Sequence, residues 1–328
     1  MDTNKTIRWG ILGAGKIARA FAIDFQYIHH AQLVAIASRD HNKAAAFASE
    51  FSIPQVFSYD ELYAHPEVDA IYIATPHSLH FPQAKRALES GKAVLCEKPI
   101  TASESECREL VDIAKANKVF LMEAMWTYFI PALEVARNWI NEGKIGELKL
   151  IQADFCFPSS ANIERLWDPA LGGGALLDIG IYPIAFANYF MNRLPDTITA
   201  SAKISSSGVD ERTGILLEYG STSASLYTSI VNKGTNTGYL YGTDGYLKLP
   251  AFWRATTIER YSNEDELVET YSDGRTTRGF HFEMQHATDC IRQGLIESPV
   301  MDFEQSIRLQ VIMGEVRRQI SLRFPFEK

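Results

Sequence analysis

The chain has 328 residues, which is longer than most single hydrophobic cores and predicts two domains of ordinary size. Hydrophobic residues make up 46% and charged residues 22% of the sequence, proportions typical of a soluble globular protein. The net charge of −8, without a basic run or patch, argues against nucleic acid and anionic membranes as partners and favours a small-molecule substrate.

The cysteines and the first residues predict the cellular compartment. The four cysteines show neither metal-ligand spacing nor a dense disulfide framework, so we expect reduced thiols. Residues 1–6 lack the apolar core of a signal peptide, and no apolar run has the length of a membrane span. We therefore expect a cytoplasmic protein with no membrane segment.

The first predicted elements are a strand at 7–12, a glycine turn at 13–18 and a helix that continues to about residue 25. The turn reads G-x-G-x-x-A, in which glycines let backbone N–H groups approach a pyrophosphate at the positive end of a helix. A second apolar strand at 33–37 follows at the spacing of a βαβ unit. The residues that we expect to bind a dinucleotide here are Gly13, Gly15, Lys16 and Ile17.

Two side chains at the end of the second strand predict which dinucleotide binds. Ser38 and Arg39 stand where an NAD enzyme usually carries an acidic residue for the ribose hydroxyls. Arginine beside a small hydroxyl can hold a 2′-phosphate, so the sequence favours NADP, with NAD as the alternative. The other interpretation of this segment is a solvated helix cap with Asp40 as the capping residue.

The alternation of strands and helices continues to residue 124. We expect strands near 56 and at 70–74, 93–96 and 119–124. We expect helices at 42–51 and at about 80–90. Two further helices are expected to begin at capping boxes, one at 58–61 and one at 103–106, and the second of these continues to 117. This predicts a doubly wound parallel sheet, a Rossmann domain, over residues 1–124.

The loop after the strand at 70–74 is expected to line the cofactor pocket. Its expected cofactor contacts are Thr75, Pro76 and His80. His77 and His80 are three residues apart, but no third ligand with matching spacing is near them. Residues 281–286 begin a helix without the His-Glu-x-x-His pattern, so we expect no metal there either.

The apolar run at 93–96 stops abruptly in Glu97-Lys98-Pro99. The carboxyl ends of parallel strands face the crevice where open α/β sheets bind ligands, and Pro99 fixes the backbone just after the lysine. We expect Lys98 to be catalytic, and Glu97 and Lys98 to contact the cofactor. The alternative is a surface lysine that follows a strand.

The second half predicts a domain over residues 125–328. A helix at 131–141, a strand at 148–155, and short alternating strands over 197–271 indicate an α+β domain with a large, mostly antiparallel open sheet. One face of that sheet is expected to bury against a second subunit. The loop at 162–174, which carries Arg165, Trp167 and three glycines, is either a pocket wall or a plain connector.

With the glycine turn, Ala74-Thr75-Pro76 and Glu97-Lys98-Pro99 in place, the chain resembles the Gfo/Idh/MocA oxidoreductase family. Residues 122–127 (MEAMWT) and 172–183 (GGGALLDIGIYP) are similar to its dimeric dihydrodiol dehydrogenase branch, which includes NADP-dependent D-xylose dehydrogenases. The resemblance implies a Rossmann domain followed by a domain whose open sheet is often the dimer face. We therefore expect a homodimer through the C-terminal sheet.

The resemblance also implies roles for individual residues. Tyr182 stands where family members commonly carry histidine, and the branch shares the tyrosine; Tyr128 stands where branch members often carry arginine. A free tyrosine, with a pKa of about 10, is a poor base, but the ammonium of Lys98 favours its anion. Asp178 is expected on the same helical face as Tyr182 by the i,i+4 rule. The expected catalytic residues are Lys98, Tyr182 and Asp178, and the expected substrate contacts are Trp126, Tyr128, Trp167, Asp178 and Tyr182.

These observations predict an NADP-dependent oxidoreductase that transfers hydride between the nicotinamide and a secondary alcohol or sugar hemiacetal carbon. A trans-dihydrodiol, an aldose or a related polyol or carbonyl compound is the expected substrate. Two alternatives remain within the same fold. One is a regulator that binds dinucleotide without turnover, as in some yeast galactose-pathway repressors, and the other is an NAD-dependent glycosidase.

Overall fold

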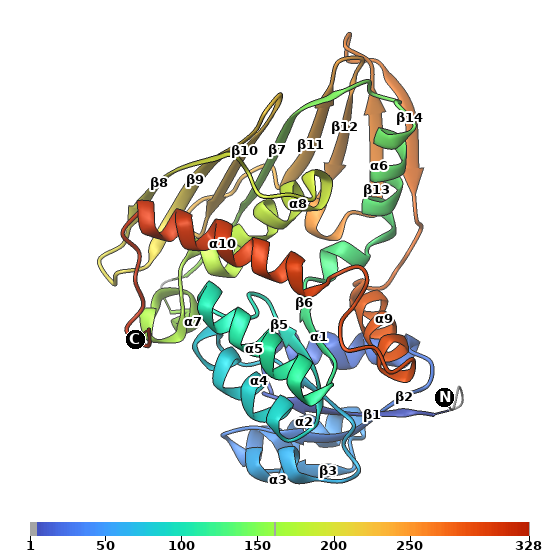
Figure 1. Ribbon diagram of the computed structural model, residues 1–328, viewed down its shortest axis with the longest axis vertical. Helices are drawn as coiled ribbons and strands as arrows, with labels where there is room; N and C mark the ends of the chain where they lie inside the picture. Colours follow the sequence, from blue (N-terminus) through green and yellow to red (C-terminus); the bar gives the residue numbers. More distant parts are fainter. Residues whose placement is uncertain (1–4, 161, 328) are drawn as a thin grey trace. The chain divides into compact units, whose positions relative to one another are not determined.

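The structure, a computed structural model, describes residues 5–160 and 162–327 (Figure 1). The chain divides into two compact units. The first runs to Trp126 and also includes Thr277–Ile307, and the second comprises Thr127–Thr276 and the residues from Arg308 onward. The first crossing lies within two residues of the expected boundary at 124/125. The return of Thr277–Ile307 to the first unit is not visible in the sequence pattern.

The first unit is built on a six-stranded parallel sheet in the order β3-β2-β1-β4-β5-β6. Its strands are β1 (Ile7–Leu12), β2 (Ala31–Ala37), β3 (Gln55–Phe57), β4 (Ala70–Ile73), β5 (Ala93–Glu97) and β6 (Leu121–Ala124). All four residues of β4 and all five of β5 are buried, as expected for strands covered on both faces. The strand order reverses between β1 and β4, so the predicted doubly wound sheet is confirmed.

Helices flank this sheet, and those that follow Asp40, Ser58 and Ser103 begin at the expected caps. They are α1 (Lys16–Asp24), α2 (His41–Phe51), α3 (Tyr59–Ala64), α4 (His80–Glu89), α5 (Glu104–Asn117) and α9 (Phe280–Arg292). Ser58 and Glu61 form a reciprocal capping box at α3. At α5 only half of the predicted box is present, because the Glu106 carboxylate accepts from the N–H of Ala102 instead of that of Ser103.

Helix α9 joins the first unit through buried polar contacts. Asp24, at the end of α1, accepts hydrogen bonds from the N–H groups of Gly279 at 3.1 Å and Phe280 at 3.0 Å, and so caps α9. On the same helix, the hydroxyl of Thr288 accepts from the indole of Trp9 at 3.2 Å. These partners are more than 250 residues apart, which explains why a local reading of the sequence placed α9 in the second domain.

The second unit is built on an eight-stranded sheet in the order β14-β13-β12-β11-β7-β10-β9-β8. Its strands are β7 (Leu148–Cys156), β8 (Thr197–Ile204), β9 (Asp210–Tyr219), β10 (Thr222–Ser229), β11 (Thr237–Gly242), β12 (Tyr246–Pro250), β13 (Thr257–Tyr261) and β14 (Leu267–Ser272). Only the β7–β10 pair is parallel among the pairs described, so the predicted mostly antiparallel sheet is confirmed.

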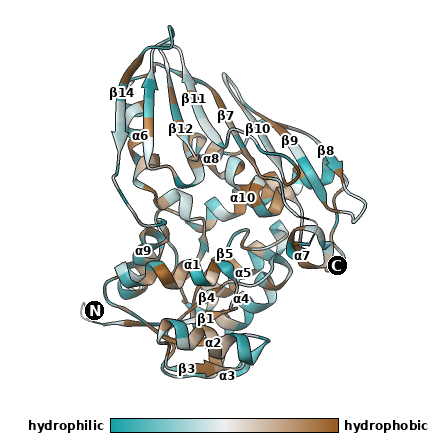
Figure 2. Cartoon of the chain, turned by 180° about the vertical axis from the view of Figure 1, so that it is seen from behind, coloured by the Kyte–Doolittle hydropathy of each residue, from teal (hydrophilic) through white to brown (hydrophobic). Residues whose placement is uncertain are grey.

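Burial alternates along the strands of this sheet, and Figure 2 shows hydrophilic and hydrophobic residues interspersed along them. In β9, Ile215 and Leu217 are buried whereas Leu216 is 41% exposed. Helix α8 (Ile181–Met191) contacts β7 and β10 on the covered face, and α6 (Pro131–Asn141) contacts β13 (Figure 1). The final helix is α10 (Phe303–Gln319).

The segment Pro169–Met191 corrects the expectation that no apolar run has the length of a membrane span. It covers 23 residues, and its most apolar 18-residue window has a mean hydropathy of 1.5, which satisfies the length and composition of a span. Its most apolar window is 89% buried within the protein, however, as in the core helix of a globular domain. The segment contains the three-residue 3₁₀ turn Pro169–Leu171, the π-helical turn Leu176–Gly180 and α8.

Candidate functional site

The glycine turn before α1 is shaped by the end of β4. Gly13 has φ +107°, and a Cβ atom there would lie 2.6 Å from the carbonyl oxygen of Ala74, so the fold itself requires glycine. Gly15 has an extended backbone, and a Cβ atom there would lie no closer than 3.8 Å to the described protein atoms. The protein therefore does not require glycine at position 15, and the space above it suits a ligand that approaches the backbone.

This turn fits a pyrophosphate. Among the described residues no side chain caps the N-terminus of α1, and its first turn, which begins with Lys16 and Ile17, holds no acidic residue. The first N–H groups of the helix, at its positive end, are thus without a side-chain cap or an acidic first-turn residue among the described residues, as suits an anionic ligand. Ala18 is fully buried, as required for close packing of the helix on the sheet.

The end of β2 shows which of Ser38, Arg39 and Asp40 caps the helix that follows. Asp40 is the N-cap of α2 and accepts from the N–H of Lys43 at 3.1 Å. Arg39 is exposed, and its backbone N–H donates to the hydroxyl of Tyr59 at 3.1 Å. Within the described residues no carboxylate forms an ion pair with the Arg39 guanidinium. Asp40 is thus occupied as a cap, and Arg39 is available for an anionic ligand.

His80 joins the ends of β4 and β5. Its ring is fully buried, with Nδ1 2.7 Å from the carbonyl oxygen of Pro99 and Nε2 2.9 Å from that of Thr75. Burial lowers the pKa of His80, as does the charge of Lys98, while the two carbonyl oxygens oppose the shift. This imidazole holds the segments after two neighbouring strands in fixed register, which is a positioning role within the expected cofactor pocket.

Lys98 directly follows β5 and is only 9% exposed, so the alternative of a surface lysine is wrong. Glu97, which precedes it, is also buried and accepts a short hydrogen bond from the hydroxyl of Tyr72. Burying an ammonium costs free energy unless charged or polar groups compensate. Such a lysine at the carboxyl end of a central parallel strand suits chemistry better than solvation.

Two further buried carboxyl groups surround this segment. Glu123 on β6 accepts from the N–H of Ile100 at 2.9 Å, and burial raises its pKa to about 7 although the charge of Lys98 lowers it. Glu283 on α9 is fully buried, and neither of its carboxyl oxygens has a hydrogen-bond partner within the described residues. Burial raises the pKa of Glu283 well above its usual range, and the charge of Glu97 raises it further.

In the second unit, Asp178 and Tyr182 lie at the start of the helix that follows the triple glycine. Asp178 belongs to the π-helical turn, which is closed by i→i+5 hydrogen bonds, and Tyr182 belongs to α8. Both residues are 7% exposed. Single π turns inside helices are frequent at functional sites.

The side chain of Asp178 is oriented by Arg165, whose guanidinium donates to it at 2.7 Å. Arg165 and Trp167 lie on a short helix, α7 (Glu164–Trp167), within the segment that was expected to be a loop. The ring of Tyr182 packs edge-on against Phe155, with centroids 5.5 Å apart. The segment with the triple glycine therefore supplies a partner for Asp178.

The aromatic residues expected to contact substrate occupy separate environments. Trp126 stacks on Phe280 in the first unit, with centroids 4.3 Å apart. In the second unit, the Tyr128 hydroxyl donates to the carbonyl oxygen of Ala185 at 3.0 Å, which gives this side chain a packing role on α8. The indole of Trp167 donates to the Ser159 hydroxyl at 3.0 Å. The described residues contain no group of three metal-ligand side chains.

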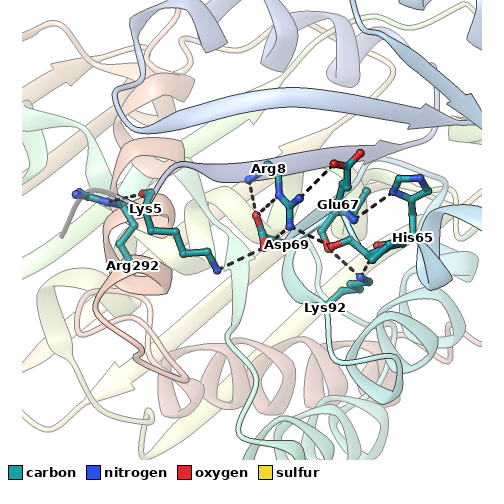
Figure 3. Close-up of polar contacts among 9 residues, drawn as sticks. Lys5, Arg8, His65, Glu67, Asp69, Lys92 and Arg292 are labelled. Atoms are coloured by element: carbon teal, nitrogen blue, oxygen red, sulfur yellow. Dashed lines mark hydrogen bonds and ion pairs between the residues drawn. The ribbon is translucent and has the colours of Figure 1, made fainter. Parts of the chain in front are cut away.

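A cavity beside β2 and β3 is lined mainly by apolar and neutral residues, together with Arg8 and Glu67. Arg8 also belongs to a cluster of charged side chains that bind one another (Figure 3). Arg8 donates to Asp69 at 2.9 Å, and Lys5 lies 3.4 Å from the same carboxylate. Lys92 donates to the carbonyl oxygens of His65 at 2.7 Å and Val68 at 2.8 Å. Because these groups satisfy one another, we interpret the cluster as structural.

Comparisons with known proteins agree with this geometry. Residues 7–125 match the model described as oxidoreductase family, NAD-binding Rossmann fold, and residues 133–248 match the GFO/IDH/MocA C-terminal domain. The trans-1,2-dihydrobenzene-1,2-diol dehydrogenase of Mus musculus is 38% identical over 98% of this chain and 99% of its own length. That of Xenopus laevis is 35% identical over 97% and 99%.

The chain belongs to the Gfo/Idh/MocA oxidoreductase family. Among solved structures, the 3-ketoreductase KijD10 of Actinomadura kijaniata, in complex with NADP and TDP-benzene, is 27% identical with a TM-score of 0.87 over 96% of this chain and 98% of that chain. The aldose-aldose oxidoreductase of Caulobacter crescentus has a TM-score of 0.88 over 97% and 98%, and at 23% identity it shows the shared fold alone. This member of the family is an NAD(P)-dependent oxidoreductase.

The two glycines of the turn give a direct test of the cofactor cradle. We expect Gly15→Ala to keep the thermal midpoint of the free protein, because the new Cβ meets no protein atom closer than 3.8 Å. The same variant should lose most of the midpoint increase that NADP produces, since a ligand that binds only the folded state stabilises it by an amount that falls as the affinity falls. Gly13→Ala is the matched control and should destabilise the free protein, because its Cβ would lie 2.6 Å from a carbonyl oxygen. Normal NADP stabilisation of Gly15→Ala would contradict the cradle.

Proposed function

We propose that this enzyme uses NADP to oxidise a secondary alcohol or sugar hemiacetal carbon, or to reduce the corresponding carbonyl. The observation that carries the proposal is a buried Lys98 at the carboxyl end of β5, in the same unit as an uncapped glycine turn. A trans-dihydrodiol, an aldose or a related polyol is the substrate class. The names of the mammalian and amphibian relatives support the diol, and the ketoreductase supports carbonyl reduction.

The experiment that tests this function is a screen of sugars, diols and dicarbonyl compounds with NADP and NADPH. Net formation or consumption of reduced nicotinamide is the expected result. Substrate conversion without a net change in the amount of reduced nicotinamide would indicate the NAD-dependent glycosidase instead. Tight dinucleotide binding without turnover of any compound would indicate a regulator.

Residues 1–124 are proposed to bind the dinucleotide, and residues 125–328 are proposed to bind the substrate. The proposed cofactor contacts are Gly13, Gly15, Lys16, Ile17, Ser38, Arg39, Thr75, Pro76, His80, Glu97 and Lys98. The proposed substrate contacts are Trp126, Tyr128, Trp167, Asp178 and Tyr182. The packing of Tyr128 and His80 gives these two residues the least support as direct contacts.

When bound, NADP supplies the nicotinamide carbon that accepts a hydride from the alcohol carbon. In the proposed mechanism Tyr182 takes the hydroxyl proton, and the ammonium of Lys98 stabilises the negative charge on both oxygens. Asp178 orients a substrate hydroxyl, and Arg165 fixes the carboxylate of Asp178 through its 2.7 Å contact. In the reverse direction the same tyrosine returns the proton to the carbonyl oxygen.

Arg39 is proposed to select NADP over NAD. We expect Arg39→Ala to weaken NADP binding by about 1.5–3 kcal/mol, the value of a hydrogen bond to a charged group, and to leave NAD binding nearly unchanged. Binding constants for both dinucleotides, measured by titration calorimetry, give the comparison. Lys43→Ala is the matched control, because it removes a neighbouring exposed cation that pairs with Asp40. Equal weakening of both dinucleotides would refute the assignment.

Lys98 and Tyr182 are proposed to act as one proton-transfer unit. Lys98→Met should abolish turnover while NADP still binds, and Tyr182→Phe should lower kcat by about 10²–10⁴-fold with a small effect on KM. The double variant should cost little more than Lys98→Met alone, since residues that act together are non-additive. Tyr189→Phe, on the same helix, is the control and should keep normal turnover. Near-normal kcat in Tyr182→Phe would show that another group is the base.

We propose that the enzyme is a homodimer through the open face of the eight-stranded sheet. That face carries Tyr239, Tyr241, Tyr246 and Tyr261, whose neighbouring rings lie 5.0–5.6 Å apart. Tyrosine is enriched at protein interfaces, where its ring packs and its hydroxyl stays hydrogen-bonded. Leu216 and Tyr227 add partly exposed apolar surface.

Sedimentation equilibrium tests the dimer. The wild type should show twice the chain mass of 36.8 kDa, and Tyr241→Glu should shift it towards the monomer by placing a charge on the open face. Tyr27→Glu is the matched control, because it makes the same change at a tyrosine that is 48% exposed on the first unit. A monomeric wild type at micromolar concentration would contradict the proposal.

The four cysteines support the proposal that the enzyme works in the cytoplasm. Cys96, Cys107, Cys156 and Cys290 are all free and buried, as expected in a reducing compartment. Cell fractionation followed by detection of the chain would test this, and recovery from an oxidising compartment would contradict it.

A further inference from the structure

Asp210 is a buried carboxyl group that the proposed mechanism does not use. It is the first residue of β9 and is fully buried. Its Oδ2 accepts hydrogen bonds from the N–H of Leu176 at 2.8 Å and from the hydroxyl of Thr213 at 2.7 Å. Leu176 begins the π-helical turn that carries Asp178 and leads into Tyr182 on α8. The carboxyl group therefore ties the sheet to the first residue of this helix.

The backbone before the helix is shaped around the same carboxyl group. Gly174 has φ +114°, and a Cβ atom there would lie 2.2 Å from Oδ1 of Asp210. Oδ1 itself has no hydrogen-bond partner within the described residues. Burial raises the pKa of Asp210 to about 7, and the nearby donors, which include the N–H of Ala175, oppose this shift. Burying a carboxyl group costs free energy, so this one needs a structural or functional reason. The space beside it admits only glycine at position 174.

We propose that Asp210 is a positioning residue, which fixes the start of the π-helical turn and thereby sets the place of Asp178 and Tyr182 for proton transfer. The inference rests on the proposed role of Tyr182. A helix start without its own side-chain cap leaves its first N–H groups unsatisfied, and none of the described residues in the turn caps it. Asp210 supplies this cap from the sheet, 34 residues along the chain.

The bond from Asp210 matters for catalysis because small displacements are costly. A misplacement of about 1 Å at reacting groups can lower a rate by about 10²-fold. Without the bond to Leu176, the turn loses a side-chain anchor from β9, and the contact that we observe from the Thr228 hydroxyl on β10 to the carbonyl oxygen of Ala175 is longer, at 3.5 Å. The covered face of the sheet would still pack against α8, so the protein would stay folded with the helix start displaced.

Asp154 offers a matched control for a purely structural role. It is on β7 of the same sheet and accepts from the N–H of Asn236 at 2.8 Å and from the hydroxyl of Thr235. A Cβ atom at Gly234 would lie 2.1 Å from its Oδ2. The two sites thus share a carboxylate, an amide donor, a threonine donor and a glycine. Asp154 anchors the loop before β11, however, instead of the helix of Tyr182.

The test compares Asp210→Ala, which removes the acceptor of the Leu176 N–H, with Asp154→Ala in the full-length enzyme. For each variant, kcat, KM, NADP affinity and thermal midpoint are measured. We expect Asp210→Ala to lower kcat by about 10–100-fold while NADP affinity stays unchanged. Asp154→Ala should keep normal kcat whatever its thermal midpoint. Normal kcat in a folded Asp210→Ala variant, or equal losses of kcat in both variants, would overturn the proposal.

A double variant separates positioning from general damage. If Asp210 acts through Tyr182, then Asp210→Ala combined with Tyr182→Phe should be no slower than Tyr182→Phe alone. Multiplying losses would overturn the proposal. Should Asp210→Ala fail to fold, Thr213→Val decides, because it removes the donor that orients the same oxygen. A lower kcat with normal NADP affinity supports the proposal, and normal kcat overturns it. Normal turnover in Tyr182→Phe itself would instead refute the proposed function.

Discussion

The carbonyl groups that follow β4 are the fixed reference for the cofactor half of this enzyme. The carbonyl oxygen of Ala74 leaves no space for a Cβ atom at Gly13 of the phosphate-binding turn. The carbonyl oxygen of Thr75 contacts the imidazole of His80. The same imidazole contacts the carbonyl oxygen of Pro99, one residue after Lys98. The glycine turn and the lysine are therefore held in register through one strand end, at the point where the strand order of the sheet reverses.

Buried carboxyl groups perform a similar task in each unit. Glu123 accepts from the N–H of Ile100, two residues after Lys98, and Asp210 accepts from that of Leu176, two residues before Asp178. Burial raises the pKa of each carboxyl to about 7. In each unit, a carboxyl group is therefore buried at a cost in free energy close to a candidate catalytic residue. Its hydrogen bond holds the neighbouring backbone in one position.

The sequence predicted what depends on local patterns and missed what depends on long-range contacts. All six strands of the first sheet and the caps at Ser58 and Asp40 follow from periodicity and capping residues. The return of α9 to the first unit does not, because the Asp24 carboxylate and its donors are far apart in sequence. The Asp210 contact does not follow from the sequence for the same reason, because Asp210 and Leu176 are 34 residues apart. The π-helical turn does not follow either, because no side-chain pattern within Leu176–Gly180 distinguishes a π turn from an α-helix.

The proposed function depends on direct passage of hydride between substrate and nicotinamide. The most direct measurement uses a substrate identified by the screen, deuterated at the reacting carbon, with NADP and nuclear magnetic resonance of both products. The account predicts deuterium at the nicotinamide C4 of the NADPH formed, in equal amount to the oxidised product. Oxidised product accompanied by NADPH without deuterium, or conversion of substrate with no NADPH at all, would contradict it.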